Sequence, residues 1–266
     1  MEQAAARTDW TPIAAAIARG EQQGAVIGAV VIAPTGERFG HNESRRFVAA
    51  STVKVPLMIA LFREIEGGRQ RLDQTYVLRD KDRADGSGVL LHLHEGAALT
   101  LADLVYLMIA ISDNTATNVL IGRIGMERVN AVMRAIGMQG STLERPMRGR
   151  VAEPGEPENW ATPADYARMI AALFDNTAAS PASCAAMTAY LEKQQNERRI
   201  ARFLPKADRP RWGSKTGSVG RAVNDVGFIE TARGALILSI FCETDDPHSG
   251  EEIIGHISGA AWRGVR

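Results

Sequence analysis

Apolar residues divide the chain into strand-like segments at both ends and helix-like segments in between. The continuous apolar run over 26–32 predicts a buried strand, and a second strand is predicted after the turn at 34–37. At the other end, strands are predicted over 211–217, 226–231 and 235–243. Because an isolated two-stranded hairpin is only marginally stable, we expect the strands from both ends to share one antiparallel sheet.

The middle of the chain has the periodicity of amphipathic and buried helices. Helices are predicted there over 101–111, 116–124, 127–136, 163–174 and 182–192, and at the two ends over 11–23 and 251–263. The pattern predicts an α+β fold of the α/β-sandwich type, with helices flanking the antiparallel sheet and an all-helical lobe inserted into it. We expect a discontinuous α/β lobe, 1–50 with 200–266, an all-α lobe, 51–199, and an active site in the cleft between them.

Charge and composition exclude several classes of protein. The 266 residues include 31 basic and 31 acidic ones, so the net charge gives no reason to expect nucleic acid or an anionic membrane as a partner. The cluster of Arg198, Arg199 and Arg202 is interpreted as a solvated helix face. The sequence has no apolar run long enough to span a membrane, and a monomer is expected.

The sequence gives no positive signal for export or for a metal site. Residues 1–7 lack the apolar core of a secretory signal, which leaves open a cytoplasmic protein or one whose leader was removed. Cys184 and Cys242 cannot form a disulfide framework and need not pair. His92 and His94 lie two residues apart without a third ligand, so we expect no metal and no cofactor.

A candidate nucleophile stands just before the apolar segment 55–62. Ser51 and Lys54 form the only Ser-x-x-Lys in the chain. Residues three apart share one face of a helix, so the Lys54 amine can reach the Ser51 hydroxyl. An apolar neighbourhood lowers the pKa of a lysine, which can then act as a base and activate the serine. The structural alternative is a helix N-cap at Ser51 followed by a solvated lysine.

Two polar triplets lie further along the chain. The first is Ser-Asp-Asn at 112–114, directly after the helix predicted to end at 111. Its structural alternative is to terminate one helix and cap the next. The second is Lys-Thr-Gly at 215–217, which closes a short apolar stretch at Trp212. Its structural alternative is a turn at the end of a strand.

Taken together, Ser-x-x-Lys, Ser-Asp-Asn and Lys-Thr-Gly resemble, in this order and at these intervals, the motif set of class A β-lactamases and penicillin-binding proteins. The order of strands, helical insert and strands resembles that serine hydrolase family too, from residue 11 to residue 263. The resemblance implies that Ser51 attacks an amide carbonyl while Lys54 accepts its proton. Ser112 would relay a proton to the leaving nitrogen.

The resemblance also implies which residues bind the substrate. The backbone N–H of Ser218, together with that of the nucleophile, would hold the oxyanion. Lys215 would support Ser112 electrostatically, and these two residues with Thr216 would bind the substrate carboxylate. Asn114 would donate to the amide of the acyl side chain.

The loop that carries the deacylating glutamate in class A enzymes differs here. With Arg145 at the family's loop arginine and Asn159 near its usual aspartate, the glutamate position holds Met147 and the loop asparagine becomes Val151. A thioether and an isopropyl group cannot orient or deprotonate water. We therefore expect acylation by β-lactams followed by slow release, because a placed general base contributes about 10²–10⁴-fold.

Other residues could compensate for these departures. Glu153, Glu156 and Glu158 are candidates to replace the missing base, and the alternative is that they are solvated loop charges. The family's arginine beyond Lys-Thr-Gly is also displaced. Arg221 lies near, and the dipeptide Asn-Asp at 224–225 stands where that arginine is expected.

Three hypotheses of function follow. The leading one is a class A β-lactamase-type serine hydrolase that opens β-lactam amides through an acyl-Ser51. The alternative is a D-alanyl-D-alanine carboxypeptidase of the same fold, which the missing glutamate favours. The third is a non-catalytic domain that binds β-lactams or peptidoglycan, and the intact Ser51, Lys54, Ser112 and Lys215 argue against it. The resemblance also implies a periplasmic or secreted protein.

Overall fold

The computed structural model describes residues 8–265 and contains one five-stranded antiparallel sheet, in the order β2-β1-β9-β8-β7. Its strands are β1 (Val26–Ile32), β2 (Arg38–His41), β7 (Trp212–Val219), β8 (Ala222–Thr231) and β9 (Gly234–Glu243). The pairing of β1 with β9 joins the two ends of the chain, as predicted from their apolar runs. The segment 1–7, on which the interpretation of the N-terminus rests, lies outside the described residues.

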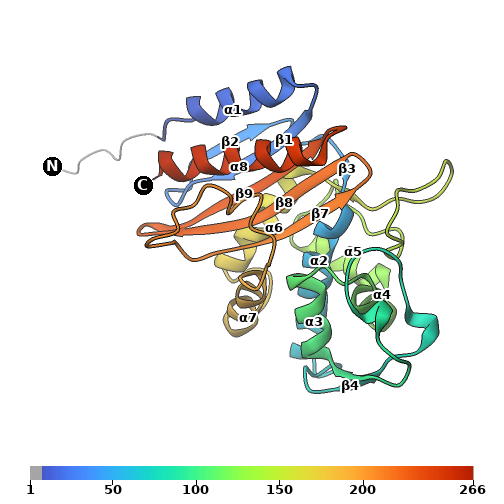
Figure 1. Cartoon of the computed structure of the whole chain (residues 1–266). Coiled ribbons are helices and arrows are strands. Elements are labelled where there is room, and N and C mark those ends of the chain that lie inside the picture. The colour runs from blue at the N-terminus through green and yellow to red at the C-terminus, as the bar shows by residue number, and fades with distance from the viewer. Residues whose placement is uncertain (1–7, 266) are drawn as a thin grey trace.

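The helices lie on both faces of this sheet (Figure 1). One face carries α1 (Thr11–Gln22) and α8 (Pro247–Gly264). The other face carries the inserted segment, which contains α2 (Lys54–Glu66), α3 (Leu101–Ala110), α4 (Asn114–Ile124), α5 (Met126–Ala135), α6 (Pro163–Phe174) and α7 (Pro181–Leu191). Within the described residues, this gives the predicted α+β architecture with a helical insert.

Short elements connect these helices. They are the strands β3 (Phe47–Val48), β4 (Thr75–Val77), β5 (Ala98–Thr100) and β6 (Trp160–Ala161), and the 3-10 helices η1 (Ala50–Val53), η2 (Asp80–Asp82) and η3 (Leu90–His92). Strand β3 pairs with β6, and β4 pairs with β5. The β3–β6 pair ties the segment before η1 to the loop that precedes α6.

The sheet separates two apolar cores. Along β9, Leu238 and Ile240 pack toward α1 and α8, whereas Ile237 and Phe241 pack toward the inserted helices. Successive side chains of a strand point to opposite faces, so a strand buried on both faces must be apolar throughout. This is why the central strands appear in the sequence as continuous apolar runs.

Strand β8 begins at Ala222, four residues before the predicted start at 226. The polar residues Asn224 and Asp225 hide this part of the strand from a hydrophobicity pattern, yet both are fully buried. Asn224 Nδ2 donates to the Val48 and Ala49 carbonyl groups at 2.9 and 3.4 Å. This contact joins the middle of the sheet to the segment that leads into η1.

The described residues contain no helix that is long and apolar enough to cross a membrane. Cys184 and Cys242 are both buried free thiols on different elements, α7 and β9. Burial raises the pKa of the Cys242 thiol to about 12.

Candidate active site

Ser51 lies in η1, directly before α2, and its side chain is almost buried. The preceding residue, Ala50, has a φ of +47°, a backbone conformation that costs a non-glycine residue about 1–3 kcal/mol. Contacts on both sides hold this turn, since Asn224 bonds the carbonyl groups before it and Thr52 Oγ1 donates to the Ala49 carbonyl at 2.7 Å. The strained turn therefore fixes the position of the candidate nucleophile.

Lys54 is fully buried and makes three hydrogen bonds with the segment 112–114. Its Nζ lies 2.6 Å from the Ser112 carbonyl oxygen, 2.9 Å from Ser112 Oγ and 2.8 Å from Asn114 Oδ1. In the described part of the chain, no hydrogen bond joins Lys54 to Ser51 Oγ. The structure thus places the amine against Ser112, whereas the sequence predicted contact with the nucleophile.

Burial and the nearby charge of Lys215 hold the pKa of Lys54 well below its usual value, and Asp113 opposes them. Lys54 Nζ donates to all three partners, which matches the three N–H groups of an ammonium. The lowered pKa makes one of these protons easier to lose, so a neutral amine can form in the site.

The Ser-Asp-Asn triplet at 112–114 acts as a helix cap as well as a site element. Asp113 is the N-cap of α4 and accepts from the Ala116 N–H at 2.9 Å. Its other oxygen accepts from the N–H groups of Val89 and Leu90. The structural alternative is therefore correct for Asp113, while its two neighbours contact Lys54.

Asn114 joins the lysine to a loop at the edge of the site. Its Oδ1 accepts from Lys54, and its Nδ2 donates to the Asp85 carbonyl at 2.7 Å. Ser87 from the same loop donates to the Ser112 carbonyl at 2.6 Å. Because an amide nitrogen has two N–H groups, Asn114 retains one donor for a ligand.

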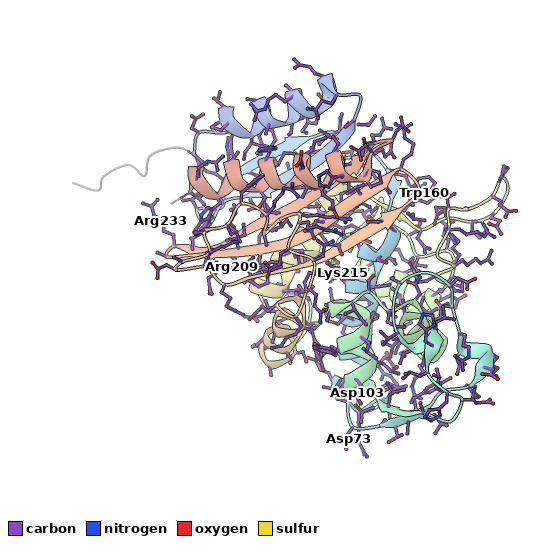
Figure 2. All side chains as sticks on the ribbon, viewed as in Figure 1. Asp73, Asp103, Trp160, Arg209, Lys215 and Arg233 are labelled. Carbon is purple, nitrogen blue, oxygen red and sulfur yellow. The ribbon has the colours of Figure 1, made fainter. Side chains whose placement is uncertain are left out.

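The Lys-Thr-Gly triplet at 215–217 lies inside β7, so the alternative of a strand-end turn is wrong. Lys215 is fully buried in the middle of the molecule (Figure 2), and its Nζ donates to the Thr216 carbonyl at 2.8 Å. Burial, together with the charge of Arg199, lowers the pKa of Lys215 to about 7, although Asp225 opposes them.

Gly217 explains how β7 approaches the nucleophile. A Cβ atom at this position would lie 3.0 Å from the Ala49 carbonyl oxygen and 3.1 Å from the backbone nitrogens of Ser51 and Thr52. Such contacts are too close for a side chain, so glycine lets the strand pack directly against η1. The three motifs of the sequence therefore meet at one place.

Two cavities of different size open at Ser51. The narrow cavity, about 120 Å³, is bordered by Asn114 and by the loop residues Met147, Arg148, Gly149 and Arg150. The wide cavity, about 740 Å³, is lined by Ser112, Thr216 and the segment Gln194–Arg199. Ser218 lines both cavities, as the nucleophile does.

Arg199 is a site residue that the sequence interpretation placed wrongly. The sequence predicts a solvated helix face for this arginine, yet it is buried and lines the wide cavity. Its guanidinium donates to the Gly217 and Asn224 carbonyl groups and to Ser218 Oγ. Burial lowers the pKa of Arg199, which the acidic residues Asp225 and Glu251 oppose. Nothing in the local sequence distinguishes it from the exposed Arg198.

Arg221 and Asp225 follow Lys-Thr-Gly in the sequence, but neither places a positive charge in the site. Arg221 is largely exposed and pairs with Asp245 at 3.0 Å. Asp225 is fully buried beside Arg199 and accepts from the Ile200 N–H at 3.1 Å. Burial raises the pKa of Asp225 to about 6 against the opposing charge of Arg199.

The loop at 145–159 is closed by a buried ion pair. Arg145 Nε and Nη2 donate to the Glu158 carboxylate at 2.9 and 2.7 Å. Burial alone would raise the pKa of Glu158, but these hydrogen bonds hold it below its usual value. Asn159 Oδ1 accepts from the N–H groups of Glu144 and Arg145. Glu158 is therefore a structural anchor, and the interpretation as a solvated charge is wrong for it.

Met147 is fixed beside the narrow cavity by its backbone. Its N–H donates to Asn118 Oδ1 at 2.8 Å, and its carbonyl accepts from Asn118 Nδ2 at 2.9 Å. The side chain is partly buried against the core of the helical insert. Met147 and Ser51 border the same cavity.

The other two glutamates of the loop, Glu153 and Glu156, are not among the described residues that line the narrow cavity. Glu153 is mostly exposed and lies 3.5 Å from Arg150. Glu156 pairs with both Arg148 and Arg150 at 2.7 and 2.6 Å, and its hydrogen bond with Arg150 lowers its pKa to about 2. A carboxylate with such a low pKa is a weak base. The described residues contain no group of three or more potential metal ligands.

Comparison with known proteins supplies the family. A model of the β-lactamase enzyme family matches residues 11–265. The chain is 32% identical to a β-lactamase of Rhodobacter capsulatus over 60% of its length, and 31% identical to one of Stenotrophomonas maltophilia over 75%. The matched parts span 56% and 66% of those two relatives.

Solved structures agree over nearly the whole chain. A β-lactamase from Sphaerobacter thermophilus is 55% identical, with a TM-score of 0.95 and 97% of each chain covered. PBP-A, at 23% identity, shares the fold with a TM-score of 0.85, over 97% of this chain and 96% of its own. Because the family model matches residues 11–265, almost the whole chain, this protein belongs to the β-lactamase enzyme family.

Proposed function

We propose that this protein opens β-lactam amides through an acyl-Ser51 intermediate and releases the acyl group slowly. The observation that carries the proposal is the contrast around Ser51. Two buried lysines, Lys54 and Lys215, have lowered pKa values and lie close enough for their charges to interact, while the loop that borders the nucleophile's narrow cavity presents Met147. The site thus has groups for acylation, while Glu158, the carboxylate that borders the narrow cavity, is paired with Arg145.

Acylation would combine the hydrogen-bonded pair of Lys54 and Ser112 with an approach of Ser51 Oγ to the Lys54 amine, a contact that is not among the hydrogen bonds of the described residues. Ser51 Oγ attacks the amide carbonyl carbon while its proton passes to the neutral amine of Lys54. When the carbon–nitrogen bond breaks, Ser112 gives its proton to the leaving nitrogen and takes one from Lys54, 2.9 Å away. The charge on the carbonyl oxygen is met by the backbone N–H groups of Ser51 and Ser218.

The wide cavity would hold the substrate carboxylate. Thr216, Ser218 and Arg199 line it together, and Arg199 already contacts Ser218 Oγ. Charge-assisted hydrogen bonds favour a carboxylate at this place, and the buried Lys215 adds to the positive potential. On the opposite side, the free N–H of Asn114 would bind the amide of the acyl group.

Deacylation is proposed to be slow because no carboxylate of the loop is available to activate water. Met147 carries no proton-accepting group, and Val151 is about half exposed at the outer part of the loop. Glu158 is engaged with Arg145, and Glu156 with two arginines. A missing general base corresponds to about 10²–10⁴-fold in rate.

The second candidate function is a D-alanyl-D-alanine carboxypeptidase, which the same methionine favours. A penicillin-type inhibitor traps such an enzyme because the acyl group is not released. PBP-A shares this fold, and a variant of PBP-A with a leucine replaced by glutamate was solved as an acyl-enzyme with penicillin G. A non-catalytic binding domain is disfavoured, because burying two lysines is costly without a chemical use.

The test is intact-mass spectrometry of the protein after brief exposure to benzylpenicillin. We expect an adduct on Ser51 that persists for many minutes, and no adduct on Ser51→Ala. Rapid loss of the adduct with accumulation of hydrolysed drug would contradict slow deacylation. No adduct at all would refute the assigned chemistry, and labelling of Ser51→Ala would refute the nucleophile. Release of D-alanine from a D-Ala-D-Ala peptide would favour the carboxypeptidase.

A further inference from the structure

The amine of Lys54 has to change its partners before it can act as the base. Its Nζ donates to the Ser112 carbonyl oxygen at 2.6 Å, to Ser112 Oγ at 2.9 Å and to Asn114 Oδ1 at 2.8 Å. The proposed function, on which this inference rests, requires the same amine to accept the proton of Ser51 Oγ. One of the three hydrogen bonds must therefore be given up during acylation.

The Ser112 carbonyl is the partner that Lys54 can leave at the lowest cost, because it has a second donor. Ser87 Oγ donates to this oxygen at 2.6 Å, the same distance as Lys54 Nζ. A carbonyl oxygen has two lone pairs and can accept both hydrogen bonds at once. Among the described residues, Asn114 Oδ1 accepts from Lys54 alone. If the amine turns away from the carbonyl, no acceptor is left without a hydrogen bond.

The backbone around Ser87 holds its hydroxyl in place. The Ser87 carbonyl accepts from the Asn114 N–H at 2.9 Å. Both neighbours of Ser87 are glycines with positive φ angles, +100° at Gly86 and +120° at Gly88. A Cβ atom on Gly86 would lie 2.6 Å from Asn114 Nδ2, and one on Gly88 would overlap the Asp113 carboxylate. This tripeptide therefore packs with its backbone directly against residues 113–114, and its one side chain is that of Ser87.

The backbone of Ser112 depends on its contacts. Its φ of +62° is a left-handed conformation that non-glycine residues rarely adopt and that surrounding contacts must maintain. Lys54 and Ser87 are the two donors to its carbonyl in the described part of the chain. Ser87 and Ser112 both line the wide cavity, so a substrate bound there would keep water from replacing a lost donor. Once Lys54 has turned away, Ser87 is the group that holds this carbonyl.

We infer that Ser87 is a positioning residue, which keeps the Ser112 carbonyl hydrogen-bonded while the Lys54 amine moves from it to Ser51 Oγ. In this step the lone pair of Lys54 takes the Ser51 proton as the bond between Ser51 Oγ and the amide carbon forms. Ser87 neither gives nor takes a proton. Without its hydroxyl the carbonyl would lose its last partner in a closed site, and an unpaired buried acceptor is costly.

The experiment measures the second-order rate of Ser51 acylation by benzylpenicillin, using time-resolved intact mass. We expect Ser87→Ala to slow acylation about tenfold at pH 7, because the released carbonyl is left unpaired. Ser87→Thr retains the hydroxyl and should stay within about threefold of the parent. The control is Ser44→Ala, at an exposed serine outside both cavities, which should leave the rate unchanged. Circular dichroism checks that each variant is folded.

The pH dependence of the same rate separates this role from a general loosening of the loop. Acylation should rise with pH as Lys54 loses its proton. In Ser87→Ala the Ser112 carbonyl is bonded by Lys54 alone and favours its ammonium form, so the rising limb should move up by about half a pH unit. The charges that act on Lys54, those of Lys215 and Asp113, are the same in both proteins. A loosened loop would lower the rate at every pH and leave the limb in place.

A double-mutant cycle tests whether Ser87 acts through the lysine. In a Lys54→Met background no amine moves, so adding Ser87→Ala should slow the residual acylation by less than about threefold. If the two losses multiply instead, Ser87 acts independently of Lys54, and the inference fails.

Three further results would overturn the inference and leave the proposed function intact. They are a parent-like rate for Ser87→Ala, a lower rate with an unshifted pH limb, and a Ser87→Thr variant as slow as Ser87→Ala. If benzylpenicillin forms no adduct with the parent protein, the proposed function fails and this inference fails with it.

Discussion

The two regions that meet at Ser51 carry different chemical groups. On one side, the fully buried Lys54 donates hydrogen bonds to Ser112 and Asn114. On the other side, the loop 145–159 has kept its structural pair, Arg145 and Glu158, while the position beside the nucleophile is Met147. The loop thus combines a buried ion pair that anchors it with a thioether, which cannot accept a proton, at residue 147.

The ionisable groups of the two regions also differ. Lys54 of the first region and Lys215 of β7 are fully buried, and burial lowers the pKa of both, to about 7 for Lys215. The carboxylates of the loop are each held by arginine, so the pKa values of Glu156 and Glu158 fall as well. A lowered pKa makes a lysine a usable base near neutral pH and makes a carboxylate a poor one.

The largest effect is expected when Lys54, the proposed base, is removed. Lys54→Met keeps the length and apolar stem of the side chain but has no lone pair to accept the Ser51 proton. We expect acylation by benzylpenicillin to slow by about 10²–10⁴-fold, measured by time-resolved intact mass. Lys206→Met, at an exposed loop lysine, is the control. A rate within tenfold of the parent would mean that Lys54 is not the base.

The structural role of the loop is tested by breaking its buried ion pair. Glu158→Gln leaves the Arg145 guanidinium buried without a counter-charge, and such a loss costs about 3 kcal/mol of unfolding free energy. Urea titration followed by circular dichroism measures the change. The double variant Arg145→Met with Glu158→Met should recover much of it, because no unpaired charge remains. A single variant as stable as the parent would show that the pair does not anchor the loop.

A carboxylate introduced into the loop beside the nucleophile's narrow cavity should speed deacylation. Met147→Glu places a carboxylate beside the narrow cavity, at a residue whose backbone is held by two hydrogen bonds with Asn118. We expect the acyl-enzyme to hydrolyse about 10²-fold faster, seen as faster loss of the penicillin adduct. Met147→Gln has the same length without the base and should leave the lifetime of the adduct unchanged. If both variants act alike, or neither acts, the assigned register of the loop is wrong.

The smallest expected effect is a pH dependence of substrate capture. Because the pKa of Lys215 is about 7, its positive charge is present below pH 7 and is lost as the pH rises above it. The second-order acylation rate should therefore decline severalfold between pH 7 and pH 9, with Arg199 retaining its charge throughout. A penicillin methyl ester has no carboxylate to attract and should not show this decline. The same decline for acid and ester would exclude the carboxylate as its cause.

The fold and most of the site could be predicted from the sequence, because their signals are local. Apolar runs marked the central strands, and three short motifs marked Ser51, Lys54 and the two triplets. The prediction was wrong where a residue's surroundings come from distant segments. Arg199 has an exposed arginine as its neighbour, and only the approach of β7, β8 and α8 makes it a buried site residue. Glu158 anchors its loop only because it forms a buried ion pair with Arg145.

By itself, the sequence determined which chemical groups this protein has and which one it lacks, since a hydroxyl, two amines and a methionine are properties of single residues. The tertiary structure decided what those groups can do. It placed Lys54 against Ser112, lowered the pKa values of both lysines by burial, and set the loop over one side of Ser51. Burial and contact depend on segments more than 50 residues apart in the chain, and no local pattern records them.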